Sequence, residues 1–334
     1  MSTELARDLV AWFRAHARDY PWRRTQDPYA ILVSEIMLQQ TQITTVLERG
    51  FYARWMQRFP DFGSLAAASE SDVLATWQGL GYYRRARNLH RLAQTIVHEH
   101  GGIFPSDPDT IRSLPGVGPY TAGAVSSFAF GLAQPIVDGN VARVLSRISN
   151  DATPVDSTAG ATKLWEQARR LVESTSDPRA LNSALMELGQ TLCRPTKPIC
   201  SECPVQRHCR AEQPEELPVK SARPELTEVT ERVFFQADAE GVWLEQETGT
   251  RRTGLWKLPA LPESPAGKLP PVLFKSRYGI TRYKVTLWVH EAPSTALAPA
   301  LRRVPHNALE DLPMASPYRR ALEKLLGSQE FRLE

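Results

Sequence analysis

The four cysteines of this chain are its most informative chemical groups. Cys193, Cys200, Cys203 and Cys209 are the only cysteines in 334 residues, and they follow a C-x6-C-x2-C-x5-C spacing. Thiolates this close together are the ligands of an iron–sulfur cluster or a zinc ion. Two disulfides within seventeen residues would constrain little of so long a chain. Zinc ribbons usually pair two C-x2-C units and this run has one, so the spacing favours iron–sulfur.

Two carboxyl groups stand in settings suited to acid–base chemistry. Glu35 shares a helical stripe with apolar residues such as Ile31 and Leu38, where burial favours the protonated form and raises the pKa. A carboxyl group that is neutral near pH 7 is a general acid, and the alternative is a glutamate hydrogen-bonded inside the core. Asp138 directly precedes a predicted helix. It is expected to cap that helix and to present its other oxygen to a developing cation.

A turn with two glycines, Leu114-Pro115-Gly116-Val117-Gly118, directly precedes a helix predicted at 120–130. Such a turn leaves backbone N–H groups pointing outward, where a phosphate can accept them with help from the helix dipole. A dinucleotide-binding fingerprint is excluded, because no strand precedes the turn and no third glycine stands at the required spacing. The alternative is a plain helix–turn–helix corner.

Basic residues are concentrated in two segments, although the net charge is only +3. Neither segment, 82–91 or 264–290, contains an acidic residue, and their basic residues are Arg84, Arg85, Arg87 and Arg91 in the first and Lys268, Lys275, Arg277, Arg282 and Lys284 in the second. Each run alone could be a solvated face. Two such runs with interleaved aromatic residues favour a polyanionic partner.

The apolar periodicity divides the chain into a helical half and a mixed half. Helix-period patterns are found at 30–47, 66–77, 86–98, 121–130, 141–148 and 161–172. A segment rich in Pro and charge predicts a linker at 213–228. Short strands are predicted at 232–237, 242–246, 255–258 and 283–290, with a terminal helix near 316–326. We therefore expect a mainly α-helical domain at 1–212 and a small α+β domain at 229–334.

Composition fits an ordinary globular protein of about two domains. Hydrophobic residues make up 42% and charged residues 23%, and no apolar run approaches the roughly twenty residues of a membrane span. The first twenty residues predict an amphipathic helix and not an export signal. A cytoplasmic, nucleoid-associated protein without membrane contact is expected.

Five segments together resemble the adenine DNA glycosylases of the MutY type, which belong to the helix-hairpin-helix superfamily that includes endonuclease III. The segments are Ser-Glu-Ile-Met-Leu-Gln-Gln-Thr-Gln at 34–42, Gly-Leu-Gly-Tyr-Tyr at 79–83, Leu-Pro-Gly-Val-Gly at 114–118, Val-Asp-Gly-Asn at 137–140, and the cysteine run. The resemblance implies an enzyme that flips adenine out of duplex DNA and hydrolyses its glycosidic bond. The adenine would be mispaired with 8-oxoguanine or guanine.

The resemblance also implies roles for individual residues. Glu35 would protonate N7 of adenine, and ionised Asp138 would stabilise or trap the sugar cation. Tyr120 and Asn140 would hydrogen-bond to these groups and to the attacking water. The residues implied at the DNA are Gln40, Thr41, Leu80 and Tyr82 at the gap in the base stack, Gly116 and Gly118 at a phosphate, and Arg84. The four cysteines would hold a structural 4Fe-4S cluster in a monomeric protein.

Tyr120 distinguishes a monofunctional adenine glycosylase from the bifunctional enzymes of the endonuclease III branch. In the endonuclease III branch a lysine stands at this position and attacks the sugar, and this chain has no amine there. A monofunctional glycosylase is therefore expected. Thymine-mismatch glycosylases also carry a tyrosine, but they usually lack the appended C-terminal domain.

The C-terminal half resembles the Nudix-like module that such enzymes use to inspect the base opposite adenine. Residues 254–259 match its Gly-Leu-Trp turn, and no Glu-rich Nudix box follows, so magnesium ligands for a second active site are lacking. Thr281 and Arg282 stand where the family carries Ser and His in its 8-oxoguanine loop, and Ser183 stands where relatives carry Gln or Glu. These departures leave two alternatives open, a mismatch glycosylase with altered opposite-base selectivity and an inactive lesion-binding protein.

Overall fold

The computed structural model describes residues 3–222, 225–249, 252–262, 269–280, 282–293 and 301–329. The chain forms two compact units. The first comprises 1–67 and 88–222, and the second comprises 68–87 and 223–334. The predicted division places 68–87 in the helical half, whereas the structure groups this segment with the C-terminal residues. The reason is polar contact inside the second unit, where the Tyr83 hydroxyl donates to the Met314 carbonyl at 3.0 Å and Arg87 donates to the Thr253 carbonyl.

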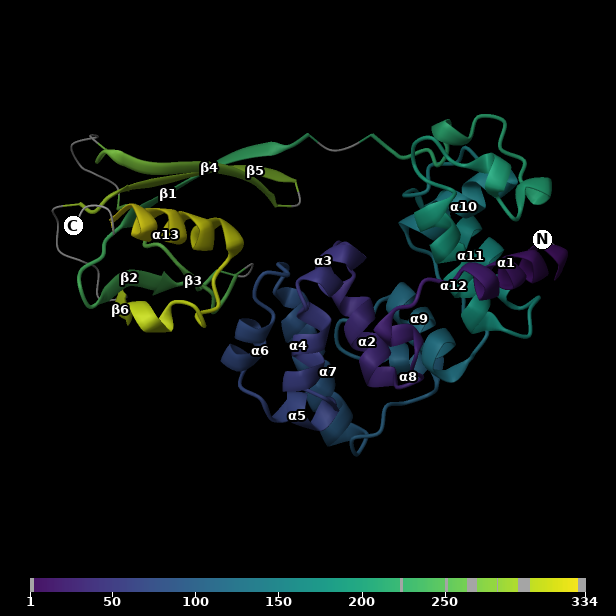
Figure 1. Cartoon of the computed structure of the whole chain (residues 1–334), viewed down its shortest axis with the longest axis horizontal. Helices are drawn as coiled ribbons and strands as arrows, with labels where there is room; N and C mark the ends of the chain where they lie inside the picture. Colours follow the sequence, from purple (N-terminus) through teal and green to yellow (C-terminus); the bar gives the residue numbers. More distant parts are fainter. Residues whose placement is uncertain are drawn as a thin grey trace. The chain divides into compact units, whose positions relative to one another are not determined.

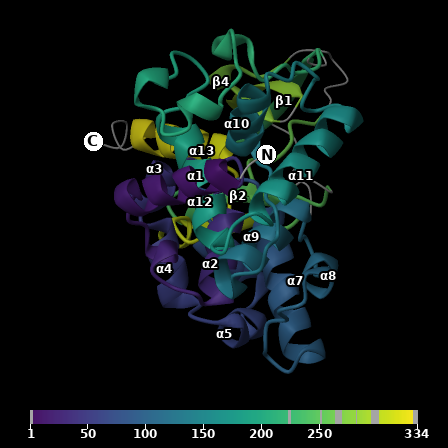
Figure 2. The same cartoon turned by 90° about the vertical axis from the view of Figure 1, so that its right-hand side faces the viewer.

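The first unit is built from helices, as the periodicity predicts. They are α1 (Thr3–His16), α2 (Pro28–Met37), α3 (Ile43–Glu48), α4 (Phe51–Arg58), α5 (Phe62–Ala67), most of α7 (Arg84–Glu99), α8 (Pro108–Ser113), α9 (Pro119–Phe130), α10 (Gly139–Ser149), α11 (Thr158–Val172) and α12 (Pro178–Thr191), with short 3-10 turns η1 (Pro21–Arg23), η2 (Cys200–Glu202), η3 (Gln206–His208) and η4 (Pro214–Glu216). The helices α1, α10, α11 and α12 pack together around Leu9, Leu145 and Leu185, and they lie side by side in both views (Figures 1 and 2).

Two of the predicted helices are interrupted. The pattern at 30–47 predicts one helix, but α2 ends at Met37 and α3 begins at Ile43. Gln40 lies between them with a φ of 56°, in the left-handed region that a continuous helix cannot contain. The pattern at 66–77 is likewise divided between α5 and α6 (Glu70–Thr76), where the Ser69 side chain accepts from Asp72 N and caps α6. The apolar pattern nevertheless continues across both breaks, because Val46 beyond the first and Val73 beyond the second are again fully buried.

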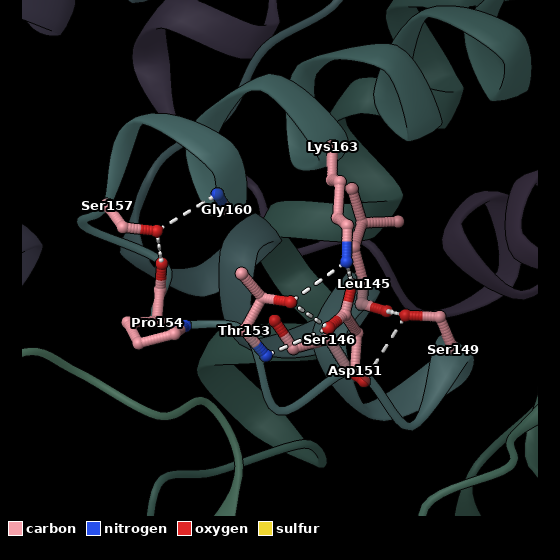
Figure 3. A network of polar contacts seen from close by, with 9 residues as sticks. All are labelled: Leu145, Ser146, Ser149, Asp151, Thr153, Pro154, Ser157, Gly160 and Lys163. Atoms are coloured by element: carbon pink, nitrogen blue, oxygen red, sulfur yellow. Dashed lines mark hydrogen bonds and ion pairs between the residues drawn. The ribbon is translucent and has the colours of Figure 1, made fainter.

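A polar network fixes the connection from α10 to α11 (Figure 3). The Asp151 carboxylate accepts from Thr153 N at 2.8 Å and from Lys163 Nζ at 3.2 Å. Ser157 caps α11, since its hydroxyl oxygen accepts from Gly160 N at 3.1 Å. These local bonds replace the helical bonds that the chain loses as it turns, and they fix where α11 begins relative to α10.

The second unit contains two small sheets. Its strands are β1 (Thr227–Phe235), β2 (Gly241–Gln246), β3 (Trp256–Lys257), β4 (Val272–Ile280), β5 (Tyr283–Glu291) and β6 (Arg302–Pro305), followed by α13 (Ser316–Gln329). One sheet has the order β1-β5-β4, with β1 parallel and β4 antiparallel to β5, and the other has the order β3-β2-β6. The helix α13 packs against the first sheet (Figure 1). The sequence did not predict β4 or β6, and β4 alternates only weakly in burial.

Candidate active site

Three elements of the first unit bring together the side chains expected to carry the chemistry. Glu35 lies near the end of α2, a helix whose residues are nearly all buried, and only 5% of its surface is exposed. Tyr120 lies in the first turn of α9, and Asp138 is the N-cap of α10. The Tyr120 hydroxyl hydrogen-bonds the Glu35 carboxyl group, and Asp138 is close enough for its charge to affect Glu35.

Burial decides the protonation of Glu35. Loss of hydration raises the pKa of this carboxyl group from 4.5 to about 7. The Tyr120 hydrogen bond lowers the pKa, the negative charge of Asp138 raises it, and the positive charge of Arg23 lowers it. Burial and the same two carboxyl groups raise the pKa of the Tyr120 phenol well above its usual value, so the phenol remains a hydrogen-bond donor. The site therefore contains a carboxyl group able to hold and give a proton near pH 7.

The environment of Asp138 differs from that of Glu35 because it is rich in donors. One carboxylate oxygen accepts from Asn140 N at 3.0 Å and from Val141 N at 2.7 Å. The other accepts from Asn140 Nδ2 at 2.9 Å. These donors and the N-terminus of α10 stabilise a negative charge. Two carboxyl groups in one site thus have unlike surroundings, one apolar and one polar.

Asn140 is held in turn by a buried arginine. Arg143 Nη2 donates to Asn140 Oδ1 at 2.9 Å and to the Gly189 carbonyl at 2.6 Å, and Arg143 Nε donates to the Cys193 carbonyl at 2.8 Å. Gly189 is required here, because a Cβ at this position would lie 2.7 Å from Asn140 Cβ. The first turn of α10 is therefore fixed against α12 and against the start of the cysteine loop.

A buried ion pair beside this site was missed by the sequence analysis. Glu187 on α12 is 1% exposed, and its carboxylate accepts from Arg23 Nη2 at 2.7 Å, while Arg18 Nε lies 3.4 Å from its other oxygen. The Arg23 guanidinium also lies over the Phe13 and Tyr20 rings. The available signal was the one that identified Glu35, an acid on an apolar helical stripe, but its partner lies 164 residues away in sequence.

The hairpin between α8 and α9 has the geometry expected for a phosphate contact. Gly116 is exposed with a φ of 77°, and a Cβ there would lie 2.6 Å from Asn88 Cβ. Gly118 is the N-cap of α9 and provides no capping side chain. The N-terminal backbone amides of α9 can therefore bind an anion.

The other residues expected at the DNA lie in two places. Gln40 and Thr41 are in the α2–α3 loop of the first unit, with Gln40 exposed. Leu80, Tyr82 and Arg84 belong to the second unit, where Tyr82 is 50% exposed with a φ of 49° and Leu80 is only 7% exposed. The exposed, left-handed backbone of Gln40 and Tyr82 is a feature typical of functional loops.

Arg85 organises the loop that carries Leu80 and Tyr82. Its guanidinium donates to the carbonyls of Leu80 at 3.0 Å and Gly81 at 3.2 Å, and it lies over the rings of Trp77 and Tyr82. Burial lowers the pKa of Arg85 to about 10, which still leaves it charged. In the sequence, Arg85 stands out only as part of a basic run.

The two departures from the pattern of the family that the sequence resembles belong to different units. Ser183 is buried on α12, beside Asn182, whose amide donates to Ser127 Oγ at 2.9 Å. Thr281 lies outside the described residues. Arg282 follows it, exposed at the start of β5, with its guanidinium 5.3 Å from the Tyr283 ring centroid.

The four cysteines lie on one loop that contacts α10 through Arg143 and Arg147. All four are free thiols, and burial raises the pKa of Cys203 to about 11, with smaller contributions from the other three cysteines. Within the described ranges, no three Cys, His, Asp or Glu side chains are grouped as metal ligands. The donor set itself, four thiols that influence one another's charge on a short loop, fits an iron–sulfur cluster.

Arg147 holds this loop in place. It is 1% exposed, and its Nη1 donates to Cys193 Sγ at 3.3 Å and to the Arg194 carbonyl at 2.7 Å. Its Nη2 donates to the Pro195 carbonyl at 3.1 Å, and its Nε to the Leu217 carbonyl at 3.0 Å. One guanidinium therefore fixes the Cys193 sulfur and the backbone carbonyls that follow it.

Among the residues that the structure describes, no helix combines the length and apolar character needed to cross a membrane.

Similarity to known proteins is concentrated in the helical part. A family model described as the HhH-GPD superfamily base excision DNA repair protein matches residues 33–168. An adenine DNA glycosylase of Homo sapiens is 46% identical over 214 residues, which cover 61% of this chain and 39% of the human protein. One from Mycolicibacterium smegmatis is 42% identical over 204 residues, covering 61% of this chain and 68% of that protein.

A solved structure of a thermostable thymine-DNA glycosylase is also similar. The match has a TM-score of 0.55 at 31% sequence identity, and it covers 61% of this chain and 93% of the thymine-DNA glycosylase chain. The chain spans less than half the length of the mammalian adenine DNA glycosylases that it matches.

Proposed function

Because the chain belongs to the adenine DNA glycosylases of the HhH-GPD superfamily, we propose that it removes adenine from mispairs in duplex DNA. The observation that carries this proposal is the pair of unlike carboxyl groups. Glu35 is buried with a pKa of about 7, and Asp138 is surrounded by hydrogen-bond donors. Glycosidic hydrolysis needs both, an acid for the leaving group and an anion for the sugar cation.

The proposed mechanism gives each group one task. An extruded adenine lies between the two carboxyl groups, because the base cannot be reached inside the stack. Protonated Glu35 gives its proton to N7 of adenine, which turns the base into a good leaving group. As the glycosidic bond stretches, Asp138 stabilises the positive charge on the sugar. Asn140 and Tyr120 hold these two carboxyl groups in position, and water completes the hydrolysis.

The reaction is proposed to stop at base removal. Tyr120 stands where a bifunctional enzyme needs an amine nucleophile, and a phenol has no nitrogen with which to form a Schiff base. Adenine is favoured over thymine by the curated relatives, although the solved thymine-DNA glycosylase has a similar fold. Only 61% of this chain matches that structure. The C-terminal sheets are proposed to inspect the base opposite adenine.

Recognition of 8-oxoguanine is assigned to the turn between β4 and β5. We place this function in a Nudix-like module of the second unit, with Thr281 and Arg282 at the lesion. Arg282 is exposed at the hairpin and offers five donors in a planar group, which suits the carbonyl oxygens of an oxidised purine or a neighbouring phosphate. The 8-oxoguanine preference over guanine depends on these two residues.

A 4Fe-4S cluster is proposed on Cys193, Cys200, Cys203 and Cys209. When bound, the cluster cross-links the loop that these residues share and supplies no electron to the glycosidic step. The chain's own contribution is the Arg147 guanidinium, which binds the loop carbonyls and the Cys193 sulfur. A monomer in the cytoplasm, associated with the nucleoid, completes the proposal.

Single-turnover excision on three duplexes tests the function. We expect rapid adenine release opposite 8-oxoguanine, slower release opposite guanine, and no thymine release from a T opposite G duplex. Borohydride should trap no covalent adduct with an active-site lysine. Thymine release alone would support a mismatch glycosylase of different specificity, and tight binding to all three duplexes without product would support a lesion-binding protein.

A further inference from the structure

The strand register brings basic side chains from all three strands of the first sheet onto one face. Residues that pair directly across strands point to the same side of a sheet. Three rows cross the sheet in the order β1, β5, β4, and they are Arg232, Trp288 and Lys275, then Thr230, Thr286 and Arg277, then Glu228, Lys284 and Gly279. We refer to these nine residues as the basic sheet face.

The opposite side of the sheet is its buried side. Val285, Leu287 and Val289 of β5 are at most 3% exposed, and the Tyr318 hydroxyl of α13 donates to Glu231 of β1 at 2.8 Å. The basic sheet face therefore points away from α13. Most of its side chains are exposed, and Thr286 and Trp288 are half-buried.

The charge of the basic sheet face is one-sided. Arg232, Lys275, Arg277 and Lys284 stand against a single carboxylate, Glu228, which lies 3.0 Å from Lys284. Lys275 Nζ lies 4.0 Å from the Trp288 ring centroid, so an aromatic ring fixes one cation at the surface. An array of exposed cations and hydroxyl groups, with a single carboxylate among them, complements the phosphates of a nucleic acid backbone.

Protection of a sheet edge does not account for this arrangement. Lysine and arginine on an edge strand prevent a sheet from pairing with another chain, and β4 and β1 are both edge strands. Lys284, however, lies on the central strand β5, where no edge exists. Arg232 is part of the same row as Lys275 although β1 and β4 are opposite edges.

We infer that the basic sheet face binds the phosphate backbone of duplex DNA, as a contact separate from the lesion-reading turn between β4 and β5. The identity of the partner rests on the proposed function. The contact is independent of sequence and of damage, because phosphates carry no base information. It would increase affinity for any duplex long enough to reach the second unit.

The test is the salt dependence of binding to an undamaged duplex. For a Lys275→Ala/Arg277→Ala variant, loss of two phosphate contacts should reduce the slope of log affinity against log salt by about 1.8 and weaken binding roughly tenfold at low salt. Arg320→Ala/Lys324→Ala on α13 is the matched control, since it removes two exposed cations from the other side of the sheet. The control slope should remain close to wild type.

A second variant should strengthen DNA binding instead of weakening it. Glu228→Gln removes the only carboxylate of the basic sheet face, and its side chain is 77% exposed, so folding should be unaffected. Binding should tighten and the salt slope should steepen. Equal slopes for the sheet-face and control variants, or aggregation of Lys275→Ala/Arg277→Ala with unchanged DNA affinity, would overturn the inference.

Adenine excision at saturating DNA separates this inference from the proposed function. All three variants should excise adenine at the wild-type single-turnover rate, because none touches the reacting groups. A wild-type protein that binds DNA with the predicted slopes but releases no adenine would refute the proposed function and leave the sheet-face contact standing.

Discussion

Glu35 and Asp138 lie in one site but have unlike surroundings. The surroundings of Glu35 exclude water, so the neutral form of this carboxyl group has the lower free energy. The surroundings of Asp138 supply three donors and a helix N-terminus, and these compensate for a charge. Each carboxyl group raises the energy of charge on the other, so ionised Asp138 helps Glu35 keep its proton.

The pH dependence of excision should report the proton on Glu35. Because burial raises the pKa of Glu35 to about 7, the acid is present below that pH and is lost as the pH rises through it. Single-turnover rates at saturating DNA should therefore fall above about pH 7. Glu35→Gln should lower the rate by ~10²–10⁴-fold and remove this pH dependence. If Glu35→Gln kept the wild-type dependence of rate on pH, the fall in rate above about pH 7 would belong to another group.

The proton on Glu35 should also affect stability, and the free energy of unfolding should fall as the pH rises. A buried carboxyl group whose pKa is raised on folding is stabilising below its unfolded pKa, and this stability is lost as the pH rises through the folded value. At pH 9, Glu35→Gln should increase the free energy of unfolding by about 2 to 3 kcal/mol relative to wild type. At pH 4 the two proteins should be nearly equal in urea unfolding, and a pH-independent difference would contradict the assignment.

Glu187 should tune Glu35 through Arg23. The Glu187 carboxylate offsets the charge of Arg23, and that charge lowers the pKa of Glu35. Glu187→Gln leaves the cation unopposed, so the pH at which excision declines should move downward. Asp19→Asn is the matched control, because it breaks the neighbouring exposed pair with Arg24. An unchanged or upward-shifted profile for Glu187→Gln would rule out this coupling.

At the scale of elements, α10 connects the site to the rest of the first unit. Asp138 caps it, Asn140 and Arg143 occupy its first turns, and Arg147 follows one turn later on the same stripe. One helix therefore fixes Asp138, the proposed anion of the reaction, at its start and the cysteine loop along its side. Displacement of its N-terminus should affect chemistry before it affects DNA binding.

Gly189→Ala tests the packing of α10 on α12. The added Cβ would lie 2.7 Å from Asn140 Cβ, so Asn140 must move and its bond to Asp138 must weaken. Overpacking of this kind costs about 1–3 kcal/mol of stability, and we expect excision to fall with DNA affinity retained. Gly327→Ala on α13 is the control, since its Cβ would meet no atom within 4 Å. Similar excision rates for the two variants would show that Asn140 is not displaced.

The elements themselves could largely be predicted from the sequence, and the exceptions have physical causes. Glu35 and Asp138 were found because each has a local signal, an acid on an apolar stripe and a cap before a helix. Glu187 has the same local signal as Glu35, but its pairing with Arg23 has none, because the two residues are 164 positions apart in the chain. The break at Gln40 was missed because a left-handed residue leaves no trace in the apolar pattern.

At the scale of the whole molecule, residues 68–87 show the limit of sequence-based division. A linker rich in proline and charge marks the boundary near 222, but nothing local indicates that an earlier segment packs with the C-terminal residues. Its contacts join Tyr83 to Met314 and Arg87 to Thr253, across more than 160 residues. The loop with Leu80 and Tyr82 is thereby supported from within the second unit.

The order of the cysteine loop should affect both the stability of the molecule and its affinity for DNA. Little of this loop is buried and its turns are short 3-10 segments, so side-chain contacts such as those of Arg147, and the proposed cluster, would provide most of its order. Cys200→Ser should remove bound iron, lower the unfolding midpoint and weaken duplex binding by about tenfold, because the basic residues on the loop lose their positions.

Ser201→Ala is the matched control for that variant, one exposed residue further along the same turn. It should keep the iron content, the unfolding midpoint and the affinity of the wild type. If Cys200→Ser lost its iron but kept the wild-type unfolding midpoint and affinity, the loop would be ordered without the cluster. The cysteines would then have a role other than structure, since the glycosidic step itself transfers no electron.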